Sequence, residues 1–227
     1  MKILLSWSSG KDSAWALHHL RQTHPGAVAG LLTTMNEAAG RVAMHAVRES
    51  LVRAQADAAG LPLHLVRIPS PCSSDIYASR MAAAVRVARD AGFTHVAFGD
   101  LFLEDVRAYR EDNMRGSGLE TLFPLWGSPT APLAEEIIDA GVRAYLTCVD
   151  PRKVDAAFAG RAFDRALLSA LPPGVDPCGE NGEFHSFAWD GPMFARPIPV
   201  EPGVVVERDG FVFADLDARR SRDRTSR

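Results

Sequence analysis

The sequence predicts an α/β protein in which a parallel sheet with helices on both faces is followed by a smaller mixed α+β domain. Two observations lead to this prediction. Short apolar runs rich in β-branched residues alternate with helical stretches, several closed by glycine, as far as about Pro151. Beyond that point short strand-like runs are separated by Pro and Gly. Repeated strand–helix units imply parallel strands that are covered on both faces.

Each element of the first part follows from a local pattern. The compact apolar run 2–7 predicts the first strand, which ends at Ser8, and helical spacing of apolar residues follows directly. Gly60 and Gly92 mark the ends of two later helices. Further strands are expected at 28–34, 63–68, 95–99, 119–125 and 142–149, and further helices at 49–59, 75–91, 103–115 and 133–140.

The second part of the chain predicts a smaller domain packed on the first. We expect domains at 1–128 and 129–216, and a disordered tail at 217–227, which contains five Arg and no apolar residue beyond Ala218. In the second domain one helix is expected at 163–171 and strands at 184–189, 194–200, 204–208 and 211–215.

The composition is that of an ordinary globular protein. Hydrophobic residues make up 47% and charged residues 23%, which excludes a disordered or fibrous chain. A net charge of -3 gives no general basic field, so nucleic acid is not expected as the main partner. No apolar run is long enough for a membrane span, and the N-terminus lacks a signal-peptide pattern. The three cysteines share no C-x-x-C spacing, which favours a reducing compartment, the cytoplasm.

Residues 8–13, Ser-Ser-Gly-Lys-Asp-Ser, carry the strongest functional signal; we call them the Ser/Gly loop. They lie between the first strand and the first helix, where α/β sheets bind ligands. Small residues let backbone amides approach phosphate oxygens, and the helix N-terminus and Lys11 add positive charge. Ser8 and Ser13 can donate hydrogen bonds, and Asp12 can cap the helix or hold Mg²⁺.

A kinase or GTPase phosphate loop is the obvious alternative. That motif, G-x-x-x-x-G-K-[ST], needs Gly at position 5 and Ser or Thr at position 12, where this chain has Leu5 and Asp12. The loop instead resembles that of the PP-loop ATP pyrophosphatases, Ser-Gly-Gly-Lys-Asp-Ser, with Ser9 in place of the first Gly. The replacement requires Ser9 to adopt an ordinary backbone conformation or to accept strain.

More specific motifs resemble the diphthine–ammonia ligase family within that superfamily. They occur in the family's order over nearly the whole chain, and they imply a Rossmann-like (HUP-type) first domain. They are Met44-His45, Arg53-Ala54-Gln55-Ala56, Gly60-Leu61-Pro62-Leu63, Phe-Pro-Leu-Trp-Gly at 123–127, Gly-Glu-Asn-Gly-Glu-Phe-His-Ser-Phe at 179–187 and Asp-Gly-Pro at 190–192.

The resemblance implies an amide ligase that uses ATP and Mg²⁺. A substrate carboxylate would attack the α-phosphorus of ATP and release pyrophosphate, and ammonia would convert the acyl-adenylate into an amide. Such chemistry needs mainly positioning and charge neutralisation. Diphthine is a modified histidine of an archaeal and eukaryotic translation factor, whereas this compact, Arg-rich chain looks bacterial. Another small-molecule or protein-borne carboxylate is therefore expected as the acceptor.

Polar residues elsewhere complete the expected site. Gly99 and Asp100 end the fourth strand at the edge that carries the Ser/Gly loop, so Asp100 is expected to reach Mg²⁺ or substrate, or else to cap a helix. Arg107 shares a helical face with Glu104 and Arg110, and either clamps an anion or forms surface ion pairs.

The Gly- and Glu-rich stretch 179–185 is expected to handle substrate or ammonia, with a plain turn as the alternative. His185 is either a proton-transfer group or a structural histidine, and His45 is expected above the ATP site. The expected catalytic residues are Lys11, Asp12, Asp100 and Glu183, with Asp12 and Asp100 as Mg²⁺ ligands. The expected ATP contacts are Ser8, Ser9, Gly10, Lys11, Asp12, Ser13, Thr33 and Thr34, and the expected substrate contacts are His45, Gly99, Arg107, Glu180, Asn181, Gly182 and His185.

Two other function classes remain open, as do the ammonia source and the oligomeric state, a homodimer included. A tRNA sulfurtransferase of the same superfamily would need a persulfide-carrying Cys or metal cluster and a basic RNA surface; the missing Cys pairs and the acidic balance argue against it. A non-catalytic nucleotide-binding module would keep the Ser/Gly loop but has no need of the acidic motif at 179–187.

Overall fold

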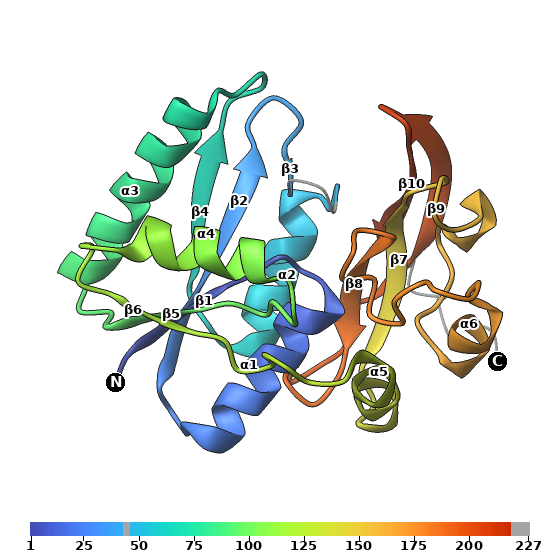
Figure 1. The fold of residues 1–227 in the computed structure, drawn as a ribbon, viewed down its shortest axis with the longest axis horizontal. Helices are drawn as coiled ribbons and strands as arrows, with labels where there is room; N and C mark the ends of the chain where they lie inside the picture. Colours follow the sequence, from blue (N-terminus) through green and yellow to red (C-terminus); the bar gives the residue numbers. More distant parts are fainter. Residues whose placement is uncertain (43–45, 219–227) are drawn as a thin grey trace, which may run out of the picture.

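The computed structural model describes residues 1–42 and 46–218, which form two sheets side by side (Figure 1). Sheet A contains β1–β6 and sheet B contains β7–β10, and the predicted fold class is confirmed. The strands are β1 Ile3–Ser6, β2 Val28–Asn36, β3 Arg41–Val42, β4 Leu63–Ile68, β5 His95–Ala97, β6 Glu120–Leu122, β7 Arg143–Val149, β8 Phe184–Asp190, β9 Val200–Arg208 and β10 Phe211–Ala218. The helices are α1 Lys11–Thr23, α2 Glu49–Ala59, α3 Ser74–Asp90, α4 Glu104–Met114, α5 Thr130–Asp139, α6 Arg165–Ala170 and the short 3₁₀ helix Ala156–Phe158.

The parallel strands of sheet A run in the order β4-β2-β1-β5-β6. Strand β1 is therefore central, and the Ser/Gly loop leaves it at the edge where parallel strands of this class carry their ligands. The two-residue strand β3 pairs antiparallel with the end of β2, with Met35 opposite Val42. This hairpin extends sheet A beyond the end of β1.

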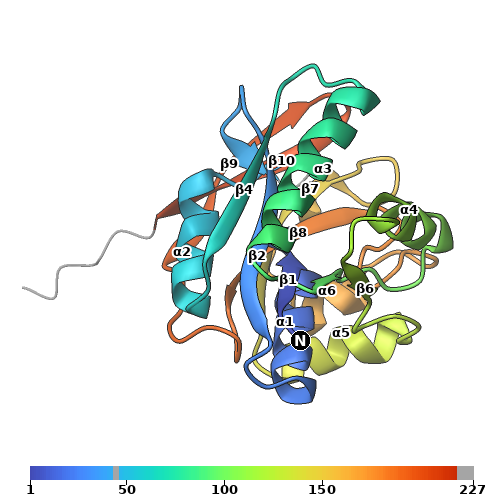
Figure 2. The same ribbon diagram turned by 90° about the vertical axis from the view of Figure 1, so that its left-hand side faces the viewer.

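Alternate residues of the strands pack on opposite faces of sheet A. Leu5 of β1 belongs to a cluster with residues of α1 and α2, whereas Leu4 and Leu32 pack with residues of α3. Figure 2 shows α2 and α3 on opposite sides of β4 and β2. The two-sided covering expected from the strand–helix alternation is thus present.

Sheet B is antiparallel, in the order β8-β7-β10-β9. The expected strand 142–149 is present as β7, but it does not extend the parallel sheet as its position in the alternation suggested. Its buried, apolar sequence specifies a strand without specifying its partners, and β7 pairs with β8 and β10 from later in the chain.

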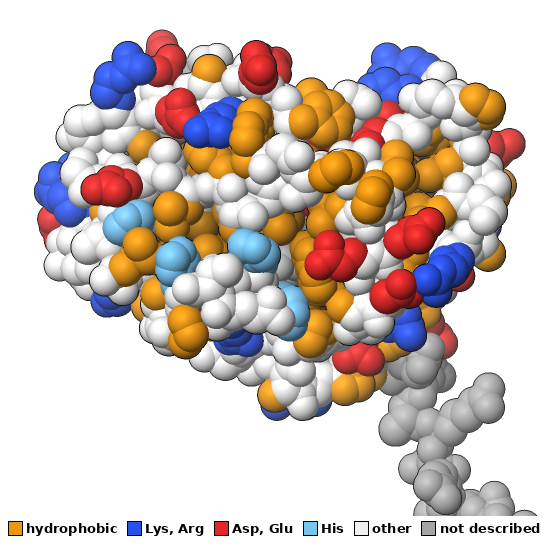
Figure 3. Space-filling view, turned by 60° about the horizontal axis from the view of Figure 1, so that its bottom comes forward, with side chains coloured by type: hydrophobic (Ala, Val, Ile, Leu, Met, Phe, Trp, Pro, Cys, Tyr) orange, Lys and Arg blue, Asp and Glu red, His pale blue; other side chains and the backbone are white. Residues whose placement is uncertain are grey.

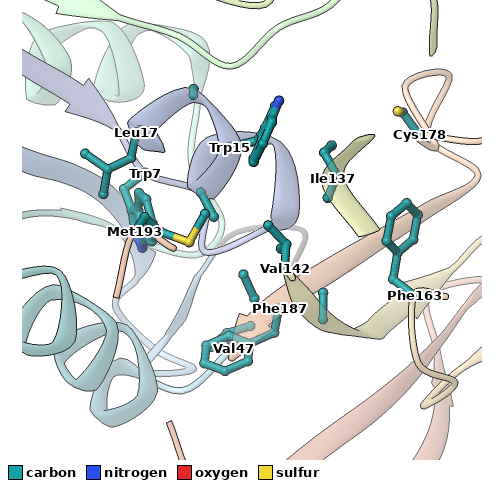
Figure 4. Packing of buried hydrophobic residues seen from close by; sticks show 14 of the residues in the cluster. Trp7, Trp15, Leu17, Val47, Ile137, Val142, Phe163, Cys178, Phe187 and Met193 are labelled. Carbon is teal, nitrogen blue, oxygen red and sulfur yellow. The ribbon is translucent and has the colours of Figure 1, made fainter. Parts of the chain in front are cut away.

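The two sheets share one hydrophobic core. A single cluster of buried residues includes Leu5 and Trp7 from the first part of the chain and Val142 and Phe187 from the second. Figure 4 shows Trp7 and Leu17 close to Met193 in this cluster. The second sheet is therefore packed against the base of the Ser/Gly loop rather than attached by a linker.

Three details differ from the expectations. The expected strand 194–200 is irregular up to Val200, because Pro197 and Pro199 cannot donate to a ladder, and Ile198 N–H instead bonds Trp189 O at 2.7 Å. Strand β3 was not predicted. Strand β10 continues through Ala218, two residues into the expected tail. Residues 219–227 and His45 lie outside the described residues.

Within the described ranges 1–42 and 46–218, no helix is long and apolar enough to cross a membrane.

Candidate active site

The Ser/Gly loop turns directly into the first helix. Gly10 is the N-cap of α1, and its carbonyl accepts hydrogen bonds from Ala14 N–H at 3.0 Å and from Ser13 Oγ at 2.9 Å. The Ser8 hydroxyl lies 3.2 Å from Ser13 Oγ and accepts from Gly10 N–H at 3.3 Å. These bonds fix the loop with the positive end of the helix dipole behind it, which is the arrangement that binds anions.

Ser9 occupies a left-handed backbone conformation, with φ of 72°. A side chain in this region costs about 1 kcal/mol relative to glycine. Its hydroxyl is buried and has no hydrogen-bond partner among residues 1–42 and 46–218. The carbonyl of Ser9 is instead held twice, by Ala188 N–H at 3.0 Å and Gln55 Nε2 at 2.9 Å. The sequence left open whether Ser9 adopts an ordinary backbone conformation or a strained one, and the structure shows the strained one.

Lys11 is almost completely buried, with 1% of its surface exposed. Its ammonium donates to both carboxylate oxygens of Asp12, at 2.9 and 3.0 Å, and to the carbonyl of Cys178. The rings of Phe163 and Phe184 lie 5.1 and 5.5 Å from the nitrogen. Burial lowers the pKa of Lys11, but Asp12, Cys178 and Glu180 together outweigh burial, and the pKa lies above its ordinary value. The cation is therefore permanent and held from both sheets.

The second sheet also holds the backbone of the loop. Lys11 N–H donates to Ser186 Oγ of β8 at 3.1 Å. Gln55 of α2 is fully buried; it accepts from the Trp7 indole at 2.8 Å and donates to Ala188 O at 2.6 Å. Strand β8 thus fixes the loop directly and through one amide side chain. This contribution of Gln55, Ser186 and Ala188 depends on tertiary contact, and no local pattern in the sequence indicates it.

A cavity of about 360 Å³ opens beside the loop. That volume lies in the ordinary range of small-molecule sites. Its polar side is formed by the loop, by the ends of β2 and β5, and by residues 178–180 and 184–186. Its apolar side is formed by strand residues and by α3 and α4. The expected site residues that line it are Ser8, Lys11, Asp12, Ser13, Thr34, Gly99, Asp100, Glu180 and His185, and the apolar side includes Leu32, Val42, Met81, Val85, Val96, Phe98 and Met114.

Glu180 brings a second-sheet carboxyl group into this cavity. Its Oε1 accepts a hydrogen bond of 2.7 Å from Leu101 N–H. Burial, assisted by the charges of Asp12 and Asp100, raises the pKa of Glu180 to about 7. The group therefore exchanges a proton near neutral pH, which is the property required of a general acid or base.

Gly99 and Asp100 follow β5, and Gly99 packs against the first turn of α1. Asp100 Oδ2 lies 3.3 Å from Arg110 Nε of α4. Gly99 packs so closely that a Cβ atom there would lie 3.2 Å from backbone atoms of Asp12 and Ser13. Gly99 therefore serves the close approach of strand end and helix, and its role is steric.

The other residues of the stretch 176–183 bond mainly to one another. Glu183 is 3% exposed, and its Oε1 accepts from Asp176 N–H at 3.1 Å and Asn181 Nδ2 at 3.2 Å. Asp176 Oδ2 in turn accepts from Glu180 N–H at 2.8 Å. Asn181 O accepts from Lys153 at 2.6 Å. These bonds shape the loop that presents Glu180, and neither Glu183, Asn181 nor Gly182 lines the cavity.

Four further predicted residues are absent from the lining of the cavity: Ser9, Gly10, Thr33 and Arg107. Thr33 is buried and its hydroxyl donates to Trp7 O at 2.8 Å. The guanidinium of Arg107 lies 4.8 Å from the rings of both Phe123 and Trp126 and pairs with Glu111 at 2.8 Å.

Two helices supply lining residues that were not predicted. Tyr77 comes from α3, and Tyr109, Asn113 and Met114 from α4. The helical pattern indicated these segments, but a helix pattern does not specify which residues face a ligand rather than the sheet.

Figure 3 shows histidine side chains among hydrophobic ones on one face of the molecule. His18 stacks on Trp15 at 4.7 Å, and His95 Nε2 lies 3.3 Å from Glu120. Among residues 1–42 and 46–218, no group of three or more His, Cys, Asp or Glu side chains is arranged to hold a metal ion.

Comparisons with known proteins assign the chain to a family. The model of the diphthamide synthase N-terminal domain matches residues 1–121, and the model of its C-terminal domain matches residues 129–214. A diphthine–ammonia ligase of Danio rerio is 26% identical over 252 residues, which cover 95% of this chain and 92% of that protein. Diphthine–ammonia ligases of Bos taurus and Homo sapiens are 29% and 28% identical over 120 residues, half of this chain and 45% of each relative. The two domain models together match most of the chain, which belongs to the diphthamide synthase family of enzymes.

Proposed function

We propose that this protein is an ATP-dependent amide ligase: it adenylates a carboxylate, and ammonia then displaces AMP. The observation that carries the proposal is the convergence, in one cavity, of Lys11 and Asp12 from the Ser/Gly loop, Asp100 from the strand end and Glu180 from the second domain. An anion-binding helix start supports phosphate binding, and a titratable carboxyl supports proton transfer beside it.

In this proposal the phosphates of ATP lie against the Ser/Gly loop. The buried cation of Lys11 and the first turn of α1 offset phosphate charge, and the apolar side of the cavity receives the adenosine. The substrate carboxylate oxygen attacks the α-phosphorus, the bond to the bridging oxygen breaks, and pyrophosphate leaves. Positioning and charge neutralisation supply most of the acceleration, since no protein nucleophile is needed.

The residues present fit Mg²⁺ that arrives with ATP. Asp12 and Asp100 line the same cavity, and Mg²⁺ in phosphate-binding sites usually takes one or two carboxylates together with phosphate oxygens and water. When bound, Mg²⁺ would neutralise charge on the phosphates. Asp12 would then be shared between the metal and Lys11, while Arg110 keeps Asp100 oriented.

We assign the second half-reaction to Glu180. As a carboxylate it accepts a proton from ammonium; the resulting ammonia attacks the acyl carbon of the adenylate, the acyl–oxygen bond breaks, and AMP leaves with that oxygen. The attached nitrogen loses one proton to water to give the amide, and Glu180 returns its proton to water. The pKa of about 7 allows this transfer near neutral pH. Glu183 keeps a supporting task, because its carboxylate orders the loop that carries Glu180.

We further propose a division of labour between residues 1–128, which bind ATP, and residues 129–216, which present the acceptor and ammonia. This division is not complete, because Ser186 and Ala188 of the second domain bond to the Ser/Gly loop. The second domain therefore also shapes the proposed ATP site. A persulfide route is not favoured: burial raises the pKa of Cys148 and of Cys178 to about 12, so neither thiol ionises readily.

The experiment is incubation with Mg²⁺-ATP, ammonium and pools of small carboxylic acids, followed by identification of the nucleotide product. Lys11→Ala should abolish carboxylate-dependent AMP formation, whereas Lys2→Ala, which removes an exposed lysine outside the cavity, should leave it unchanged. Full activity of Lys11→Ala would remove the Ser/Gly loop from its assigned role.

A further inference from the structure

Arg41 and Arg48 both bond to one carboxylate of sheet B, that of Asp215. Arg41 of β3 donates to Asp215 of β10 through both nitrogens of its fork, at 3.0 and 3.1 Å. Arg48, the residue before α2, also donates to Asp215 and lies 3.3 Å from Asp217. A bidentate arginine–carboxylate pair is directional as well as strong. We call Arg41, Arg48 and Asp215 the clasp.

The backbone of β10 is shaped to aim Asp215 at these arginines. The pairing of β10 with β9 shifts register between Ala214 and Leu216, which is where Asp215 lies. Such irregularities re-aim a side chain. The Asp215 carboxylate is steadied further by Leu216 N–H, which donates to its Oδ1 at 3.0 Å.

A glycine on the neighbouring strand accommodates the second carboxylate. A Cβ atom on Gly203 would lie 2.4 Å from an Asp217 oxygen. A side chain at position 203 would require the exposed Asp217 carboxylate, which faces Arg48, to shift.

The clasp holds a strand that forms part of the cavity wall. Val42, next to Arg41, lines the cavity and is 4% exposed. The Arg41 guanidinium also donates to Ala46 O at 2.6 Å, and Arg41 and Arg48 lie opposite each other as an isolated antiparallel bridge. Within sheet A, β3 pairs with β2 through two residues only. Its other backbone support is local, with Val42 N–H donating to Val47 O at 2.8 Å and Ala46 N–H donating to Val42 O at 3.0 Å.

We infer that Asp215 is a positioning residue for the nucleotide site: from sheet B it holds β3, and with it Val42, against the cavity. The inference rests on the proposed function in one respect, that the ligand of the cavity is ATP. The contacts by which Asp215 holds β3 do not depend on it. Asp217 is the matched control, because it is an acidic residue of the same strand, its ion pair among the described residues is with Arg48 alone, and it is 53% exposed.

The first test measures position 42 without any ligand. Val42→Cys is made with Cys72→Ser, which removes the exposed thiol; Cys148 and Cys178 are buried. Adding Asp215→Asn should raise the rate at which the introduced thiol reacts with a maleimide about tenfold, whereas Asp217→Asn should change it less than twofold. Equal rates in the two backgrounds would overturn the inference.

The second test measures Mg²⁺-ATP binding by calorimetry in the full-length chain with native cysteines. Asp215→Asn should weaken binding about tenfold and Arg41→Lys, which keeps the charge but loses the fork, about threefold; Asp217→Asn should bind like the wild type. Unchanged affinity of Asp215→Asn would overturn the role in the nucleotide site. If the wild type bound no ATP, the proposed function would fail, while the labelling result would still decide whether the clasp holds β3.

Discussion

The backbone N–H of Lys11 and the hydroxyl oxygen of Ser186 are joined by a hydrogen bond of 3.1 Å that crosses from the first turn of α1 to β8. The Ser/Gly loop is therefore completed by the second sheet. Residues 175 positions apart in the chain share one buried contact. Substitutions in β8 should consequently alter ATP binding as well as acceptor chemistry.

Ser186→Ala tests this relationship. Removing the hydroxyl leaves Lys11 N–H buried without this acceptor, which costs about 1 to 2 kcal/mol. Binding of Mg²⁺-ATP should weaken roughly five- to thirtyfold by calorimetry. Ser169→Ala, which removes an exposed hydroxyl bonded only within α6, is the control and should bind normally. Equal affinities would show that β8 does not shape the loop.

Ser9→Gly should stabilise the protein. The native φ of 72° is strained for Ser, and the buried Ser9 hydroxyl has no hydrogen-bond partner in the described part of the chain. We expect a gain of about 1 kcal/mol in the free energy of unfolding, measured in urea. The matched change Ser169→Gly, inside helix α6, should instead lose about 1 kcal/mol. A loss from Ser9→Gly comparable to that of the control would contradict the strain.

Gln55→Leu should destabilise the junction of the two sheets. The amide bonds the Trp7 indole, Ser9 O and Ala188 O, and a leucine of similar size would leave the indole N–H and Ala188 O without it. The expected loss is about 2 to 4 kcal/mol. Thermal or urea unfolding measures it, with Gln22→Leu as the exposed control. A loss below 1 kcal/mol would mean that these bonds contribute little.

Glu180→Gln should change the pH dependence of both stability and turnover. Burial raises the pKa of Glu180 from 4.5 to about 7, so the folded state holds the proton more tightly than the unfolded chain. This contribution to stability is present below about pH 4.5 and is lost as pH rises to about 7. The glutamine variant lacks that loss, and relative to the wild type it should gain roughly 1 to 3 kcal/mol across this window.

Turnover gives the second readout. If Glu180 must be ionised to accept a proton, amide formation by the wild type rises through about pH 7, and the glutamine variant loses that step. Glu135→Gln, on the exposed surface of α5, should keep the wild-type profile. If Glu180→Gln kept the pH dependence of the wild type, a group other than Glu180 would accept the proton from ammonium.

Local sequence was sufficient to predict the parallel sheet and the Ser/Gly loop. An apolar run, then Ser and Gly, then apolar residues at helical spacing predicts a strand, a tight loop and a helix. Strand β1, the Ser/Gly loop and α1 follow that pattern. Strand β3 was missed because two residues give no periodicity. The irregular stretch 194–199 was taken for a strand because its apolar residues outweighed Pro197 and Pro199.

The site was predictable where residues adjoin the loop or a strand end, as with Lys11 and Asp100. It was not predictable where a role depends on tertiary contact. The raised pKa of Glu180 arises from burial against the first domain, and Gln55 acts only because β8 crosses beside it. Tyr77 and Tyr109 line the cavity through the packing of α3 and α4, which helical periodicity leaves undetermined.

The most direct test of the central claim follows an oxygen atom. A carboxylic acid that supports turnover is labelled with ¹⁸O in its carboxyl group and incubated with the protein, Mg²⁺-ATP and ammonium, and the nucleotide is analysed by mass spectrometry. Attack of the carboxylate on the α-phosphorus predicts AMP that carries one ¹⁸O from the acid, with pyrophosphate unlabelled. Formation of ADP, or of AMP without the label, would contradict the account.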